Sequence, residues 1–293
     1  MLSVNGGVAS VKFSGSSVFS NRAGQNAGNS GGVAYFSGTS ASSATISFSG
    51  TSVYGNMAAM GNGGVVAFSG GTAVVSTAAA SNFYGNQAGN ASASSGGRGG
   101  SGGVIWANVS SFTAGFVASS FTGNAATVNG GVVTVSGTGG SLATVSTTGS
   151  TFTSNTAAGT GGVLFSALAT ALTVQSSTFS SNRALGVGGV GGVAAIQPAG
   201  TSRSSLVQIA GSSFTQNQAT TTGGVLSLLR ASGGLNVSSS TFSSNQAITV
   251  RIVCAYFLFH HHYLTSMMIL FNSTVNQLRL DSFLPFFLIF RAV

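Results

Sequence analysis

Acidic residues and cysteine are almost absent from this sequence. Of its 293 residues only Asp281 is acidic, glutamate does not occur, and Cys254 is the single cysteine. An intrachain disulfide is therefore excluded, and a zinc site would lack thiolate partners. Glycoside hydrolysis by the usual route needs two carboxylates, and calcium sites need acidic oxygen ligands. We therefore expect no catalytic residue, no metal site and no cofactor in this chain.

Histidine is also rare, and the charged residues do not form clusters. The three histidines stand together at 260–262, so none is available to activate the many serines before position 250. A metal site built from this run and Cys254 is not predicted, because adjacent residues on a strand point to opposite faces. Lys12 and eight arginines give a net charge of +8, but they are scattered singly. Without a basic stripe, nucleic acid is not an expected partner.

What the sequence does contain is a repeated motif centred on asparagine. In eight copies an asparagine is followed two residues later by alanine, and six copies have phenylalanine three residues before the asparagine. The asparagines are Asn21, Asn56, Asn86, Asn124, Asn155, Asn182, Asn217 and Asn245, and the phenylalanines are Phe83, Phe121, Phe152, Phe179, Phe214 and Phe242. Val18 and Val53 take the phenylalanine position in the first two copies. A recurring unit of about 30 residues indicates a solenoid.

A second motif, Gly-Gly-Val, alternates with the first. In four copies it begins six residues after the asparagine, at Gly130, Gly161, Gly188 and Gly223. The residues after it favour a short strand. A second strand precedes the phenylalanine, and apolar pairs such as Leu172 and Val174 are expected on one face with Phe179. The pattern of strand and turn predicts an all-β, right-handed parallel β-helix of about eight rungs over residues 1–249.

Stacking of equal positions gives each motif residue an expected role. The phenylalanines should form an internal apolar column, and the alanines should occupy a narrow inward site. Asparagine tolerates the left-handed conformation, so the asparagines should stack at a turn and pair with one another and with the backbone. The small residue before each asparagine fits the same corner. The paired glycines should supply another bend, through positive φ or close backbone approach. We therefore interpret these residues as a structural ladder, not as ligands or glycan sites.

Phe-x-x-Asn alternating with a Gly-Gly-apolar element resembles the repeats of the chlamydial polymorphic outer membrane proteins and similar β-helix proteins. The resemblance covers residues 3–249, with Gly-Gly-Val where that family usually has Gly-Gly-Ala-Ile. It implies an extracellular or cell-surface location and, as in some members, an adhesive role. The first eight residues have neither a basic nor an apolar region, so they encode no secretory signal. We expect a chain that is not exported, or a fragment of a larger protein.

The repeat pattern stops after Asn245, and residues 250–293 form a hydrophobic non-repeat tail without glycine. Three interpretations of this tail compete. It could associate with a membrane, although the apolar stretch 252–271 is interrupted by the histidines. It could cap the last rung. The interpretation we prefer is that the tail is translation past a true exon boundary near Val250.

The composition favours a non-catalytic module, and the resemblance implies a structural or adhesive role at the cell surface, with cell-surface glycans or other β-solenoids as candidate partners. Two alternatives stay open: a pectin-lyase-like, carbohydrate-active β-helix enzyme whose catalytic rungs lie outside this chain, and a gene-model fragment without independent function. Trp106, the only tryptophan, is expected at the core or rim and not as a sugar platform. Arg98, in the glycine-rich insertion 90–101, is a weak candidate for recognition. Ice binding is not predicted, because Thr45, Thr72, Thr113, Thr144 and Thr173 are irregularly spaced.

Overall fold

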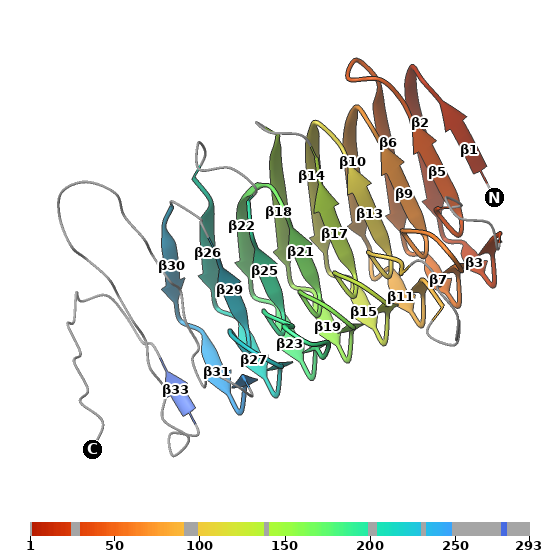
Figure 1. Ribbon diagram of the computed structural model, residues 1–293. Coiled ribbons are helices and arrows are strands. Elements are labelled where there is room, and N and C mark those ends of the chain that lie inside the picture. Colours follow the sequence, from red (N-terminus) through yellow and green to blue (C-terminus); the bar gives the residue numbers. More distant parts are fainter. Residues whose placement is uncertain are drawn as a thin grey trace.

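A computed structural model describes residues 2–24, 30–90, 99–137, 141–198, 204–229 and 233–247, together with the backbone of 277–279. Within these residues the chain is all β and contains no helix. It winds through about seven turns of a parallel β-solenoid, as Figure 1 shows from the first rung in red to the last in blue. The predicted all-β parallel solenoid is therefore confirmed.

Four sheets run along the length of the solenoid, and each turn of the chain adds one strand to each. Sheet A consists of β1 (Leu2–Asn5), β5 (Ala34–Ser37), β9 (Val66–Ser69), β13 (Ile105–Asn108), β17 (Val133–Ser136), β21 (Leu164–Ser166), β25 (Ala194–Ile196) and β29 (Leu226–Leu228). Sheet B has the longest strands and consists of β2 (Val8–Ser14), β6 (Ser43–Ser49), β10 (Thr72–Ala78), β14 (Ser111–Val117), β18 (Leu142–Thr148), β22 (Ala169–Gln175), β26 (Leu206–Ala210) and β30 (Leu235–Ser238).

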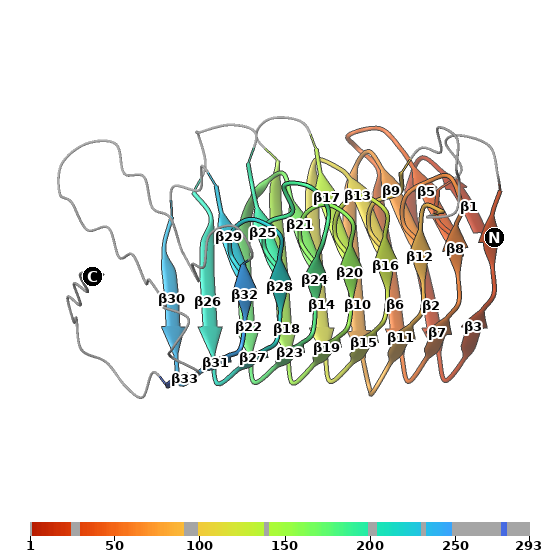
Figure 2. The same ribbon diagram turned by 60° about the horizontal axis from the view of Figure 1, so that its bottom comes forward.

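The two shorter sheets complete each turn. Sheet C consists of β3 (Ser17–Phe19), β7 (Ser52–Tyr54), β11 (Asn82–Tyr84), β15 (Ser120–Thr122), β19 (Thr151–Thr153), β23 (Thr178–Ser180), β27 (Ser213–Thr215) and β31 (Thr241–Ser243), with β33 (Gln277–Arg279) pairing antiparallel to β31. Sheet D, in view in Figure 2, consists of β4 (Arg22–Ala23), β8 (Met57–Ala58), β12 (Gln87–Ala88), β16 (Ala125–Ala126), β20 (Thr156–Ala157), β24 (Arg183–Ala184), β28 (Gln218–Ala219) and β32 (Gln246–Ala247).

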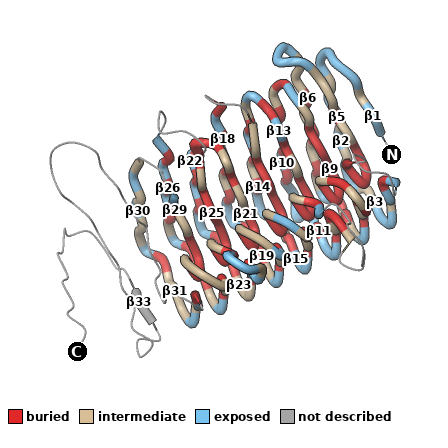
Figure 3. Tube along the Cα trace, in the orientation of Figure 1, coloured by how far each residue is buried: buried red, intermediate tan, exposed pale blue. Residues whose placement is uncertain are grey.

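The core is the interior of the coil. Along the strands of sheet B, side chains alternate between buried and more exposed, as in β22, where Leu172 and Val174 are buried between exposed residues. This alternation is what a strand with one face on a core requires. Figure 3 shows buried residues recurring rung after rung along the molecule. The core is therefore one continuous apolar column instead of a separate cluster in each repeat.

One sequence expectation about the strands is wrong. Leu172 and Val174 lie in sheet B, but Phe179 lies in sheet C, because the chain bends at Ser176, which has a φ of 48°. All three side chains are still buried. They meet because two sheets face one interior, and not because they share the face of one strand. Each turn accordingly has four strands, where the sequence indicated two.

The bend between sheets C and D also differs from the expectation. The left-handed conformation belongs to the residue before each asparagine, for example Ser154 at φ 56° and Gln216 at φ 57°, and not to the asparagine itself. The asparagine then has ordinary backbone geometry and is free to turn its amide inward. The small or flexible residue at the preceding position is thus the one that makes the corner.

The paired glycines behave as predicted. Gly161 has a φ of 70°, and a Cβ added to Gly162 would lie 2.1 Å from the backbone oxygen of Gly192 in the next rung. The pair therefore combines a positive φ with a close backbone approach. In one copy the spacing of six residues pointed to the wrong glycines: register pairs Leu164 with Ala194, so the bend is made by Gly191–Gly192 and not by Gly188.

Candidate functional site

The predicted asparagine ladder is present at the corner between sheets C and D. The backbone N–H and the side-chain Nδ2 of Asn155 both donate to Oδ1 of Asn182 at 3.0 Å. The same Nδ2 donates to the backbone oxygen of Phe121 at 2.9 Å. The Oδ1 of Asn155 in turn accepts two hydrogen bonds from Asn124. Each internal asparagine therefore uses every donor and acceptor of its amide within the protein.

The ladder is closed to solvent. Six of its members are 0% exposed: Asn56, Asn86, Asn124, Asn155, Asn182 and Asn217. No buried side-chain polar atom in the described part of the chain lacks a hydrogen-bond partner. A ligand would have to break existing bonds to reach these amides. The asparagines are therefore structural, and a binding site must be sought on the outside of the coil.

The predicted phenylalanine column is also present. Its rings stack nearly parallel, with centroids 4.7 Å apart between Phe152 and Phe179 and 4.9 Å apart between Phe179 and Phe214. The same stacking joins Phe83 to Phe121, Phe121 to Phe152 and Phe214 to Phe242. The predicted alanines are buried beside the column, at 0% exposure for Ala157, Ala184 and Ala219. Residues at the same position in successive copies of the motif therefore stack on one another.

A second polar ladder was missed by the sequence reasoning. Two residues before each phenylalanine position lies a serine or threonine, which is buried in every copy after the first. The hydroxyls of Ser81, Ser150, Ser177, Ser212 and Ser240 each accept a hydrogen bond from the backbone of the preceding rung. Ser150 N–H donates to Ser177 Oγ at 3.2 Å, and Ser177 N–H donates to Ser212 Oγ at 3.1 Å. Like the asparagines, these residues follow a positive-φ residue, such as Gly149 or Ser176. Their occurrence in all eight copies was the available signal, obscured by the abundance of serine elsewhere.

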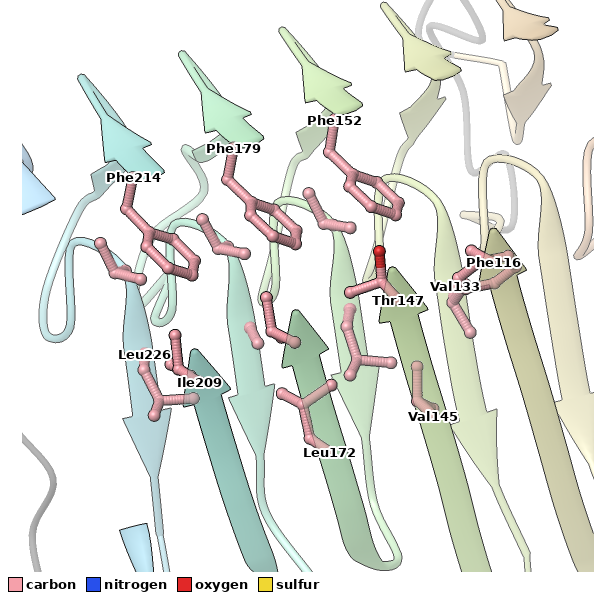
Figure 4. A pocket seen from close by; sticks show the side chains of 16 residues that line it. Phe116, Val133, Val145, Thr147, Phe152, Leu172, Phe179, Ile209, Phe214 and Leu226 are labelled. Carbon is pink, nitrogen blue, oxygen red and sulfur yellow. The ribbon is translucent and has the colours of Figure 1, made fainter. Parts of the chain in front are cut away.

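The cavity that lies along the phenylalanine column is small and apolar. Figure 4 shows the rings of Phe152, Phe179 and Phe214 projecting toward Leu172, Ile209 and Leu226. A cavity of about 40 Å³ lies among these side chains. Its one polar lining group, the hydroxyl of Thr147, is already paired with Ser177 at 3.1 Å. A small apolar cavity of this kind stays dry and adds no chemistry.

The outer face of sheet B is broad and hydroxyl-rich. Its strands pair in parallel over as many as seven consecutive positions, so outward residues form straight columns. One column contains Lys12, Ser47, Ser76, Gly115, Ser146, Thr173, Gln208 and Asn236. Lys12, at the first rung, is the one charged side chain on this face in the described ranges. The columns repeat at the strand spacing of about 4.8 Å.

The strand register shows that the threonines are stacked more regularly than their spacing in the sequence indicated. Thr45, Thr113 and Thr144 stand in one outward column, with Val74 between the first two. Their irregular spacing in sequence comes from insertions between strands and not from irregular stacking. Thr72 and Thr173 belong to neighbouring columns. The face is therefore more regular than the sequence indicated, although threonine does not fill any column.

Charge is sparse over the rest of the described surface. Besides Lys12, the charged side chains within the described residues are Arg22 and Arg183, both outward on sheet D. Arg183 lines a polar depression of about 310 Å³ with glutamines 216, 218 and 246. No group of three metal-ligating residues occurs in the part of the chain that the structure describes. Arg98, Cys254, Asp281 and the histidine run lie outside it.

Comparison with known proteins gives no relative. No family model matches the chain, and neither the curated proteins nor the solved structures contain a match. The described residues include no helix of the length and apolarity needed to cross a membrane. What the molecule does must therefore be argued from its own surfaces.

Proposed function

We propose that this chain is a non-catalytic structural or adhesive module of a larger extracellular or cell-surface protein. The observation that carries the proposal is the outer face of sheet B, which presents straight columns of hydroxyl, amide and apolar groups with a single charge at one end. A flat, regular and nearly neutral face suits a partner that is itself flat, regular and neutral. Ordered polysaccharide and the face of another β-solenoid both have these properties.

The side chains available argue against catalysis. The described residues contain no carboxylate, histidine or cysteine, so they provide neither a carboxylate pair nor a base to activate a serine. The polar ladders that line the corners are fully paired with one another. A carbohydrate-active enzyme with catalytic rungs outside this chain is the alternative, and acidic residues in additional rungs of the parent protein would favour it.

Location and other partners follow the same proposal. The resemblance of the repeats to the chlamydial surface proteins supports an extracellular or surface role. Nucleic acid is not a proposed partner, because the described cations are three and lie on two different sheets. Membrane association is proposed only through residues 250–293, which lie outside the described part except for a short strand. A gene-model fragment without independent function is the other alternative, and transcript sequence across Val250 tests it.

Binding to insoluble neutral polysaccharides tests the proposal. We expect the folded chain to sediment with at least one of them, and we expect Thr113→Lys combined with Thr144→Lys to weaken that binding. Both threonines are exposed, so the fold should tolerate the change. Thr156→Lys on sheet D is the matched control and should bind like the parent. Failure of a demonstrably folded sample to bind any polysaccharide or any solenoid partner would count against the proposal.

A further inference from the structure

The outer side of sheet A carries aromatic rings in three alternate rungs. One column of register-paired residues there contains Tyr35, Ala67, Trp106, Thr134, Phe165, Ala195 and Ser227. A large ring thus alternates with a small side chain over six successive strands. The alternation cannot be seen in the sequence, where the three rings are separated by segments of different length.

The rings point away from the core. Trp106 stands between Ile105 and Ala107, which are 2% and 0% exposed and belong to the core. Because neighbouring side chains on a strand point to opposite faces, Trp106 must lie outside. Tyr35 and Phe165 occupy the same position in their strands, and all three rings are half-buried. Of the two positions expected for Trp106, the core and the rim, the structure therefore excludes the core.

The small residues of this column are covered although they also lie on the outer side. Ala67 and Ala195 are 0% exposed and Thr134 is 4% exposed. Ala67 has a ring on each flanking strand, from Tyr35 and Trp106, and Thr134 has Trp106 and Phe165. Rings lying across the small residues would produce this burial, and for Thr134 the backbone of Asn129, to which its hydroxyl donates at 2.7 Å, adds to it. In that arrangement one face of each ring rests on the protein and the other faces outward.

Sheet C provides the contrast. There Phe19, Tyr54 and Tyr84 occupy consecutive rungs and stack on one another, with centroids 5.0 and 4.7 Å apart. Rings in consecutive rungs use their faces for each other and leave only edges to solvent. On sheet A, rings two rungs apart are separated by roughly 10 Å and cannot stack. Their outward faces remain for a ligand.

A sugar chain is the ligand whose chemistry fits this row. The apolar C–H face of a pyranose packs on an aromatic ring, and the ring spacing of roughly 10 Å is close to the disaccharide repeat of an extended β-1,4-linked glycan. Beside the rings runs a polar outward column of Asn5, Ser37, Ser69, Asn108 and Ser136, suited to sugar hydroxyls. No described residue of sheet A is charged, which complements a neutral glycan and not an acidic one.

We propose that the outer face of sheet A binds a single neutral β-1,4-linked glycan chain along the solenoid axis. Tyr35, Trp106 and Phe165 then lie beneath alternate sugars of that chain. The inference rests on the adhesive function proposed above and names its ligand class. It concerns a single chain on sheet A, whereas the flat face of sheet B suits an ordered surface. The two can therefore be tested separately, with soluble and insoluble ligands.

Trp106 is the only tryptophan, so its fluorescence reports on this row directly. The experiment titrates the full chain with cellohexaose and with chitohexaose, and uses maltohexaose, an α-1,4-linked hexamer, as the control sugar. We expect one of the β-1,4-linked hexamers to change the fluorescence saturably, and maltohexaose to have no effect. In Phe165→Ala, the affinity for that hexamer should fall about tenfold or more.

The control variant is Tyr84→Ala, which removes an exposed ring from sheet C and should bind like the parent. Tyr35→Ala provides a second ring variant, and urea denaturation of each variant confirms that it is folded. Equal affinity of the parent and both folded ring variants would overturn the proposal, and so would absence of binding to both β-1,4-linked hexamers. If insoluble polysaccharide still binds through sheet B in that case, the adhesive function stands and only the sheet A assignment falls.

Discussion

At the residue scale, the asparagine ladder has the strictest requirement for one residue type in the fold. A buried amide that donates twice and accepts twice can be replaced by no other side chain of the same size. An aspartate would keep the acceptors, lose the donors and bring a charge into a column whose six inner members are 0% exposed. This explains why the position is asparagine in all eight copies while its neighbours vary.

Asn155→Asp should therefore destabilise the protein by about 3 to 5 kcal/mol at pH 7, because it buries a charge that has no counter-charge. Burial raises the pKa of an introduced carboxyl, so the folded state holds its proton to higher pH than the unfolded state. The loss should accordingly be smaller at pH 4 and grow as the pH rises. Urea denaturation at both pH values measures it. Asn82→Asp, at an exposed position, is the control and should change stability by no more than about 0.5 kcal/mol.

The phenylalanine column predicts a second residue-scale effect. Phe179 is 3% exposed and stacks on rings above and below it, so Phe179→Ala should cost about 3 to 5 kcal/mol. Phe19→Ala, which removes a ring that is 51% exposed, should cost much less. Equal urea midpoints for the parent and Phe179→Ala would mean that the column is not internal.

The asparagines, phenylalanines and alanines could all be placed from the sequence, because each occupies a site that few residue types can fill. The serine ladder could not. Ser177 and Ser212 have the same role as the asparagines, but serine also covers the outer surface of the same rungs. A residue type that suits both a buried corner and a solvated face gives no pattern by itself.

At the element scale, strand ends are set by backbone geometry that only some residues allow. Sheets B and C are divided at a positive-φ residue such as Gly149 or Ser176, and sheets C and D at another such as Ser154 or Ser181. The sequence predicted the glycine bend, since Gly-Gly is rare outside turns. It also predicted a turn at the asparagines, between sheets C and D. It did not predict the bend between sheets B and C, because alanine, serine and glycine occupy that bend without a distinctive signature.

Two glycine substitutions test this account of the bends. Gly162→Ala would place a Cβ 2.1 Å from a backbone oxygen that cannot move independently, so it should destabilise by at least about 3 kcal/mol. Gly115→Ala, in the middle of β14, meets only Ser146 Oγ at 3.6 Å. It should stabilise the strand by roughly 0.5 kcal/mol. Thermal or urea denaturation of both variants measures the difference, and similar stabilities would contradict the close approach of the glycines.

At the scale of the whole molecule, the strand register determines which side chains lie next to one another on the outer faces. Neighbouring asparagines in the ladder are separated by as few as 27 and as many as 38 residues. The extra residues lie in insertions, so Thr113 and Thr144 align while their sequence positions give no hint of it. The same holds for the aromatic row of sheet A. The sequence thus predicted the inside of the solenoid, where the same residue type recurs from rung to rung. It did not predict the outside, where strand positions recur but residue types differ.

Cross-linking across one column tests the register most directly, and both proposed binding faces depend on it. In a Cys254→Ser background, Thr113→Cys with Thr144→Cys places two thiols on neighbouring strands at the same level, about 4.8 Å apart at Cα. Thr113→Cys with Ser146→Cys offsets them by two residues, to roughly 8 Å, beyond the reach of a disulfide. Under mild oxidation, counting free thiols by mass spectrometry should show a disulfide in the first variant and free thiols in the second. A disulfide in the offset variant, or none in the aligned one, would contradict the stacked solenoid described above.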